Sequence, residues 1–186
     1  MACTFITHPE VVVDPAVPVV DWGLSATGEE RARRLAEQLT GEVRVVISSG
    51  ERKAIETAAI LAEALGVPVS ADPALGEMDR SATGYLPSEE FERTADAFFA
   101  QPEVSVRGWE RAVDAQRRIE TAVRRHAHDG TGDGIAFVAH GGVGGLLMAS
   151  LAAVPITRAL DHPGLGSVFT FDARRWTLLS PWESIR

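Results

Sequence analysis

The chain has 186 residues and a mass of 19.9 kDa, which is the size of one compact domain. Hydrophobic residues make up 45% and charged residues 24%, so a disordered or fibrous chain is excluded. The 26 acidic and 18 basic side chains give a formal net charge of −8, which disfavours partners such as nucleic acid or an anionic membrane surface. We therefore expect one domain over residues 1–186.

The cysteine content and the N-terminal residues bear on where the protein works. The single cysteine, Cys3, leaves no partner for an internal disulfide. No apolar run reaches the ~18 residues that span a bilayer. Residues 1–8 lack the basic segment and apolar stretch of a secretion signal. These features predict a cytoplasmic protein.

Short apolar runs alternate with amphipathic stretches in the first half of the chain. Thr27 and Glu30 form a capping-box pattern that predicts the start of a helix, and Gly41 marks its end. Glu51 begins a second helical pattern, which Gly66 ends. Strands are expected at residues 3–7, 43–48 and 67–71.

Strands and helices also alternate in the second half. Ser88 is expected to cap a helix that ends before Pro102, and residues 135–139 give the strongest buried-strand pattern. The other elements expected are a helix over residues 109–128, a polar turn over 129–134, a helix over 141–151, and a hairpin of strands 167–171 and 176–179. This alternation predicts the α/β class, as a three-layer α/β/α sandwich with a mostly parallel central sheet.

Two histidines fall at the carboxyl ends of expected strands, where open α/β sheets bind ligands. His8 follows the first strand and His140 follows strand 135–139. Gly141 and Gly142 come next and begin a helix, whose unpaired N–H groups can hold an anion. Either histidine alone is read more simply as a residue that ends a strand and bonds locally. Together, beside a helix start, they indicate phosphoryl chemistry.

The glycine-rich stretch at residues 141–145 does not match a nucleotide-binding motif. A P-loop needs a Lys after its last glycine, and none follows here. A dinucleotide fingerprint that starts at Gly142 would need its third glycine where Leu147 stands. Gly144 and Gly145 are therefore expected to allow close packing of helix on sheet, and no nucleotide cofactor is expected.

Five short segments stand at intervals along the chain: Phe-Ile-Thr-His-Pro-Glu (5–10), Leu-Ser-Ala-Thr-Gly (24–28), Ser-Ser-Gly-Glu-Arg-Lys-Ala-Ile-Glu-Thr-Ala (48–58), Leu-Gly-Glu (75–77) and Val-Ala-His-Gly-Gly-Val (138–143). In this order they resemble the motifs of the histidine phosphatase superfamily, also called phosphoglycerate mutase-like. Those motifs are a strand that ends in Arg-His-Gly-Glu, then Leu-Thr-x-x-Gly, Ser-Ser-x-x-x-Arg-Ala-x-Gln-Thr-Ala, Leu-x-Glu and a second histidine motif. One match alone is weak, whereas five in order, across essentially the whole chain, are specific.

The resemblance implies a phosphomonoesterase that works through a phosphohistidine. His8 would be the nucleophile and Glu77 the general acid and base. His140, as a cation, would stabilise charge on the phosphoryl oxygens with help from the Gly141 amide. The scheme needs no cofactor and no metal ion. The substrate would be a phosphorylated small molecule or a phosphoprotein.

The phosphate-binding positions depart from the family's pattern. Thr7 and Pro9 stand where the family has Arg and Gly, and Lys53 stands where it has a second Arg. Lysine keeps the charge but loses the bidentate fork of arginine. Arg80 is the best candidate for a replacement cation, and Arg107 and His162 are weaker ones. The expected phosphate-binding residues are Thr7, Arg52, Lys53, Arg80 and Gly141.

Two other functions fit the same fold. A catalytically degenerate domain that only binds phosphate or phosphoproteins is suggested by Thr7 and Pro9. The presence of His8, Glu77 and His140 favours an enzyme instead. A phosphoglycerate mutase-type phosphotransferase is less favoured, because mutases that the chain resembles are usually longer and keep an arginine-rich phosphate pocket.

Overall fold

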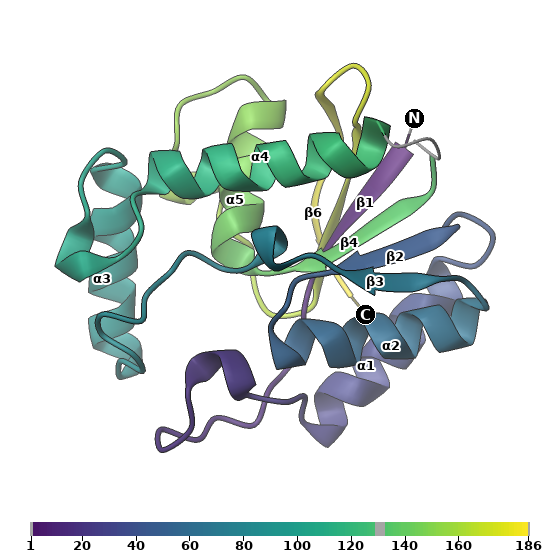
Figure 1. The fold of residues 1–186 in the computed structure, drawn as a ribbon, viewed down its shortest axis with the longest axis horizontal. Coiled ribbons are helices and arrows are strands. Elements are labelled where there is room, and N and C mark those ends of the chain that lie inside the picture. The colour runs from purple at the N-terminus through teal and green to yellow at the C-terminus, as the bar shows by residue number, and fades with distance from the viewer. Residues whose placement is uncertain (1, 129–132, 186) are drawn as a thin grey trace.

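A computed structural model describes residues 2–128 and 133–185, which contain five α-helices and six strands (Figure 1). The strands are β1 (Ala2–Thr7), β2 (Val45–Ser48), β3 (Val69–Ala71), β4 (Ile135–Ala139), β5 (Ser167–Asp172) and β6 (Thr177–Ser184). The helices are α1 (Ala26–Gln38), α2 (Arg52–Leu65), α3 (Ser88–Ala100), α4 (Ala112–His128) and α5 (Gly141–Leu151). The first four residues of the turn expected over 129–134 lie outside the described part. Within that part, no helix has the length and apolar character that crossing a bilayer requires.

The strands form one mixed sheet in the order β3-β2-β4-β1-β5-β6. Strands β1, β2, β3 and β4 pair in parallel, whereas β5 is antiparallel to β1 and β6 is antiparallel to β5. The expectation of a mostly parallel sheet is therefore wrong. The C-terminal hairpin was predicted, and a hairpin must pair antiparallel. Its pairing beside β1, which brings it into the main sheet, is a long-range contact that the sequence pattern does not reveal.

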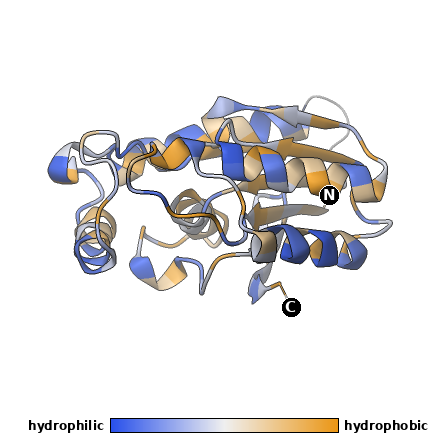
Figure 2. Cartoon of the chain, turned by 90° about the horizontal axis from the view of Figure 1, so that it is seen from below, coloured by the Kyte–Doolittle hydropathy of each residue, from blue (hydrophilic) through white to orange (hydrophobic). Residues whose placement is uncertain are grey.

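Helices cover both faces of the sheet, with α1 and α2 on one side and α4 and α5 on the other (Figure 1). Successive side chains of a strand point to opposite faces. Phe5 and Phe137 accordingly belong to the core beneath α4 and α5, while Ile6 and Val138 belong to the core beneath α1 and α2. Figure 2 shows the strands mainly in the hydrophobic colour and the helices in mixed colours. The two cores hold β1 and β4 in the centre of the fold.

The first helix begins earlier than its capping-box pattern predicts. Its N-cap is Ser25, whose side chain accepts a hydrogen bond from the N–H of Gly28 at 3.1 Å, and not Thr27. A Cβ on Gly28 would lie 2.1 Å from the backbone oxygen of Glu10, so this glycine lets the helix start against the segment after β1. By contrast, α2 ends at Gly66 as predicted, with φ +65°.

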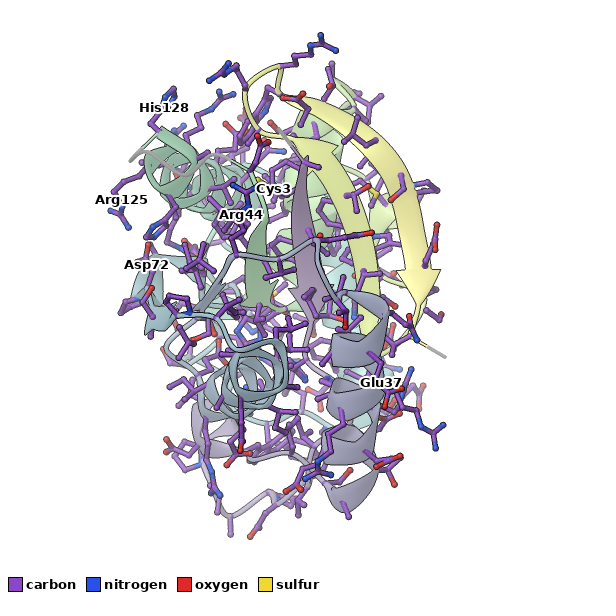
Figure 3. The ribbon with its side chains drawn as sticks, turned by 90° about the vertical axis from the view of Figure 1, so that its right-hand side faces the viewer. Cys3, Glu37, Arg44, Asp72, Arg125 and His128 are labelled. Carbon is purple, nitrogen blue, oxygen red and sulfur yellow. The ribbon has the colours of Figure 1, made fainter. Side chains whose placement is uncertain are left out.

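The connection after β3 is tied to the C-terminal end of α4. Asp72 accepts hydrogen bonds from Arg125 and, at 2.8 Å, from Nε2 of His126. Figure 3 shows Asp72 and Arg125 on the same side of the molecule. The same carboxylate accepts from the N–H of Ala74 at 3.0 Å. These contacts fix the start of the segment that leads to Glu77.

Candidate active site

His8 and His140 lie side by side because β1 and β4 are adjacent parallel strands, with Thr7 paired to Ala139. The centroids of the two imidazole rings are 5.4 Å apart, and the ring planes meet at 64°. Both side chains are buried, with His8 8% exposed and His140 1% exposed. The expected juxtaposition of two histidines at the carboxyl edge of the sheet is therefore present.

The hydrogen bond of His8 fixes which ring nitrogen can react. Nδ1 lies 2.8 Å from the carbonyl oxygen of Pro9, which can only accept, so Nδ1 carries the proton. Nε2 then has a free lone pair and no hydrogen-bond partner among the described residues. Burial, with a further effect from Lys53, lowers the pKa of His8 to about 4. The ring is neutral at pH 7, as a nucleophile must be.

His140 is held in place through its Nε2 atom. Its Nε2 lies 2.7 Å from Oγ of Ser49 and 3.3 Å from Oε1 of Glu51. Its Nδ1 is buried and has no partner among the described residues. Burial lowers the pKa of His140 well below its ordinary value. The ring is therefore neutral in the free protein, and an anion beside it would raise the pKa again.

Glu51 is a site residue that sequence reasoning missed. It is the N-cap of α2, and its carboxylate forms an ion pair with Lys53. Its Oε1 also accepts the N–H of Glu77 at 2.9 Å. Burial acts to raise the pKa of Glu51, but His140 and Lys53 outweigh it and lower the pKa to about 2. The family pattern leaves this position unspecified, so only its acidic character directly before two basic residues could have drawn attention to it.

Lys53 is almost completely enclosed, with its side chain 4% exposed. Its Nζ donates to the carbonyl oxygen of Val19 at 2.8 Å as well as to Glu51. A buried ammonium is tolerated when it is paired and hydrogen-bonded in this way. The lysine at the position of the family's second arginine is thus enclosed beside Glu51, and its role toward phosphate stays a prediction.

Glu77 lies against the start of α5. Its carboxylate accepts the N–H groups of Gly142 at 3.1 Å and Val143 at 2.9 Å. These are amides that we expected to be available to a phosphate, so part of the anticipated anion cradle holds a carboxylate instead. Burial and the nearby charge of Glu51 raise the pKa of Glu77, despite these N–H donors. A Cβ on Gly142 would lie 2.8 Å from Oε1 of Glu77, so only glycine permits this approach.

Two of the expected phosphate-binding residues lie elsewhere. The hydroxyl of Thr7 accepts the N–H of Ser167 at 2.8 Å, and it lies 3.3 Å from the carbonyl oxygen of the same residue. It therefore joins the end of β1 to the start of β5. Arg52 is on the outer side of α2, where its side chain is 62% exposed and bonds Glu56 at 2.7 Å. Each side chain already has a structural partner outside the histidine pair.

Arg80 and Gly141 remain close to the site. The guanidinium carbon of Arg80 lies 4.9 Å from the centre of the Phe91 ring, and its charge acts to lower the pKa of Glu77. A Cβ on Gly141 would lie 1.7 Å from the ring of His162, so this histidine packs directly over the start of α5. Arg107 pairs with Glu90 at 2.6 Å, away from the histidines.

A cavity of about 740 Å³ opens beside the two carboxylates. Glu51, Glu77 and Arg80 line it with charged groups, and residues 15–20 line it with largely apolar side chains. Tyr85 also lines it. Among the residues that the structure describes, no group of three or more His, Cys, Asp or Glu side chains is placed to hold a metal ion.

Comparison with known proteins matches the chain to one family. The family described as "Histidine phosphatase superfamily (branch 1)" matches residues 15–182. The match confirms the resemblance seen in the sequence, although it begins after the Thr-His-Pro segment. A search of curated proteins found no significant match.

Solved structures share the fold over nearly the whole chain. Bacillus stearothermophilus YhfR has a TM-score of 0.81 at 24% identity, covering 96% of this chain and 94% of its own. Mycobacterial glucosyl-3-phosphoglycerate phosphatase has a TM-score of 0.76 at 22% identity, covering 98% and 95%. Phosphoserine phosphatase from Entamoeba histolytica, solved with 3-phosphoglyceric acid, has a TM-score of 0.78 at 16% identity, covering 98% and 96%. With a family match across most of its length, the chain belongs to the histidine phosphatase superfamily.

Proposed function

We propose that this protein is a phosphomonoesterase that works through a phosphohistidine on His8. The observation that carries the proposal is the neutral ring of His8, with Nδ1 bonded to Pro9 and Nε2 free. The centroid of this ring lies 5.4 Å from the centroid of the His140 ring. Proline retains its carbonyl group, so the replacement of glycine at position 9 does not remove this contact. Two of the solved structures of the same fold are phosphatases of small phosphorylated molecules by name, which agrees with the proposal.

In the first step, Nε2 of His8 attacks phosphorus and the bond from phosphorus to the ester oxygen breaks. The proton on Nδ1 stays there, so the imidazole of the intermediate carries a positive charge. Glu77 gives its proton to the departing alkoxide, which leaves as an alcohol. The raised pKa of Glu77 favours the protonated carboxyl group that this step needs.

In the second step, water attacks phosphorus and the bond from nitrogen to phosphorus breaks. The Glu77 carboxylate takes one proton from that water, so the acid of the first step serves as the base of the second. Inorganic phosphate leaves, and His8 and Glu77 return to their starting protonation states. The net reaction is the hydrolysis of one phosphate ester by one water molecule.

Lys53, Arg80 and His140 supply positive charge for the phosphoryl oxygens. Lys53 is already enclosed in the site, and Arg80 lines the cavity. His140 is neutral in the free protein, and we expect it to take a proton when a phosphate dianion arrives, because an adjacent negative charge raises its pKa. The buried and unpartnered Nδ1 of His140 is the atom available for that proton.

The cavity favours a phosphate ester whose alcohol part is apolar. Residues 15–20 contain two prolines, an alanine and three valines, and they line the cavity together with Tyr85. Glu51 and Asp79, which also line the cavity, would repel a second acidic group on the substrate. A sugar phosphate or an acid such as phosphoglycerate would find few side-chain donors here.

The decisive test is to trap the phosphorylated protein. Mixing with an aryl phosphate and quenching within milliseconds should leave phosphate on the chain that is labile in acid and stable in alkali. His8→Ala should abolish both the trapped phosphate and turnover, whereas His128→Ala, at an exposed helix end, should change neither. A His8→Ala protein that keeps most of its kcat would disprove the assignment.

A second function is favoured by one specific feature, the neutral Thr7 where the family has an arginine, with its hydroxyl already bonded to Ser167. A domain that binds phosphate groups without catalysis would not need the transition-state stabilisation that an arginine supplies. Calorimetric titration with inorganic phosphate separates the two functions: binding without any trapped intermediate supports the non-catalytic reading.

A further inference from the structure

Arg118 of α4 binds the segment that carries Glu77 through hydrogen bonds. One terminal nitrogen donates to the carbonyl oxygens of Ala74 at 2.9 Å and Gly76 at 2.8 Å. The other donates to the carbonyl oxygen of Glu77 itself at 3.1 Å. Three carbonyl groups within four residues are thus held by one planar cation, which presents its donors in a fixed fork.

Glu110 completes this arrangement from the opposite side of the guanidinium. It accepts from Nε of Arg118 at 3.0 Å and from a terminal nitrogen at 2.7 Å, which is the bidentate geometry of a strong pair. It also accepts the N–H of Asp79 at 3.1 Å, and its own N–H donates to the carbonyl oxygen of Asp79 at 2.8 Å. The side chains of Glu110 and Arg118 are 19% and 27% exposed, so the pair is well shielded.

Glu77 is therefore fixed through its backbone on both sides. Its carbonyl group is held by Arg118, and its N–H donates to Glu51 at 2.9 Å. Its carboxylate meets the N–H groups of Gly142 and Val143. Among the described residues, Arg118 is the only one whose side chain binds three backbone oxygens of residues 74–77.

We propose that Arg118 and Glu110 form a positioning pair that sets the placement of Glu77 for proton transfer to the leaving group. This inference rests on the proposed function, in which Glu77 is the general acid. Neither side chain is bonded to a histidine in the structure, so we expect the pair to act through the backbone segment that carries Glu77. Proton transfer requires heavy atoms at hydrogen-bond distance, and a displacement of about 1 Å can lower a rate about 100-fold.

The first experiment compares Arg118→Lys with Arg117→Lys. Lysine at position 118 keeps the charge but cannot bridge three carbonyls and a carboxylate. Arg117 is 73% exposed, and among the described residues its side chain pairs only with Asp114 on its own helix. The rate of phosphohistidine formation is measured by rapid quench with two substrates. From n-hexyl phosphate, whose alkoxide needs a proton, Arg118→Lys should be slower by roughly 10- to 100-fold. From p-nitrophenyl phosphate, whose phenolate leaves unaided, it should stay within about threefold.

The second experiment combines Arg118→Lys with Glu77→Gln. If Arg118 acts through Glu77, the double variant should form phosphohistidine from n-hexyl phosphate as slowly as Glu77→Gln alone, because residues that act as a unit are not additive. A merely structural role would multiply the two losses and would slow both substrates alike. Glu110→Ala should reproduce the leaving-group pattern and serves as the second variant if Arg118→Lys folds poorly.

The outcomes separate this inference from the function on which it rests. If wild-type protein forms no phosphohistidine, the proposed function fails. If wild-type protein forms it, but Arg118→Lys slows both substrates equally or adds its loss to that of Glu77→Gln, the positioning pair is overturned and the function stands. Equal rates for Arg118→Lys and wild type on n-hexyl phosphate would overturn it as well.

Discussion

Glu51 and Lys53 form an ion pair inside the site, with their side chains only 13% and 4% exposed. The same carboxylate reaches Nε2 of His140 at 3.3 Å and the N–H of Glu77 at 2.9 Å. It thus contacts a lysine, a histidine and a backbone amide, the kinds of donor that bind phosphate oxygens. An incoming phosphate dianion must either displace this carboxylate or bind beside it.

Glu51→Gln should bind inorganic phosphate more tightly and shift the pH profile. Two like charges about 5 Å apart repel by roughly 3 kcal/mol at an effective dielectric of 20, so removing one should lower the Kd for phosphate at least about tenfold. Because Glu51 raises the pKa of Glu77, its loss should move the alkaline limb of kcat to lower pH. Calorimetric titration and a pH profile with n-hexyl phosphate measure the two effects.

Glu56→Gln is the matched control for this substitution. Glu56 lies on the same helix and pairs with Arg52 outside the site. It should leave both the phosphate affinity and the pH profile unchanged. Weaker phosphate binding by Glu51→Gln would mean that this carboxylate organises the phosphate site instead of competing for it.

Lys53→Met and Arg52→Met should differ sharply, although the residues are adjacent in sequence. Lys53 is enclosed in the site, whereas Arg52 is bonded to Glu56 on the surface. A hydrogen bond to a charged group contributes about 1.5–3 kcal/mol, so Lys53→Met should lower kcat/KM by roughly 10- to 100-fold. Arg52→Met should stay within about twofold, since exposed pairs contribute little. Equal losses in the two variants would contradict the placement of Arg52 outside the site.

Arg80→Met should raise KM more than it lowers kcat. The guanidinium lines the cavity and lies over Phe91, so it can meet the phosphate as substrate enters. The loss of one charged hydrogen bond predicts a KM about tenfold higher, measured by steady-state kinetics. Arg107→Met, which removes an exposed pair with Glu90 and a long hydrogen bond to the hydroxyl of Thr94, is the control. An unchanged KM for Arg80→Met would remove Arg80 from substrate binding.

Much of the site could be predicted because its residues sit at the ends of recognisable elements. His8 and His140 follow strongly apolar strands, and the parallel pairing of Thr7 with Ala139 brings them together as expected. Glu77 was found from a family motif, and its contact with the start of α5 is a tertiary contact that no local pattern encodes. Local sequence patterns predict the ends of helices and strands well, but they do not show which distant elements contact each other.

Arg52 was expected in the site on the basis of its charge alone. Arg52 and Lys53 are both cations at the start of α2, but successive helix residues are rotated by about 100°, so only one faces the histidines. Glu51 escaped notice because an acidic residue opposes phosphate binding. Arg118 lies far from every motif, and only the folded structure shows that it holds the Glu77 segment.

The low pKa of His8 should make the stability of the fold depend on pH. Folding lowers the pKa of His8 from about 6.5 to about 4, so below pH 6.5 the unfolded chain binds a proton that the folded chain does not. The free energy of unfolding should therefore fall as the pH falls, by up to ~1.4 kcal/mol per pH unit from this residue. Between pH 7 and pH 5 the loss should be about 2 kcal/mol.

Urea unfolding of wild-type protein and His8→Asn at these two pH values isolates this contribution. Asparagine does not titrate, so the variant should lose about 2 kcal/mol less than wild type on going from pH 7 to pH 5. The pKa of His140 is lowered in the same direction, so His140 should add a loss of stability at acid pH that both proteins share. If both proteins lose stability equally, His8 keeps an ordinary pKa in the fold. At pH 6 most of its rings would then be protonated and unable to attack phosphorus, and activity should already fall there instead of persisting toward pH 4.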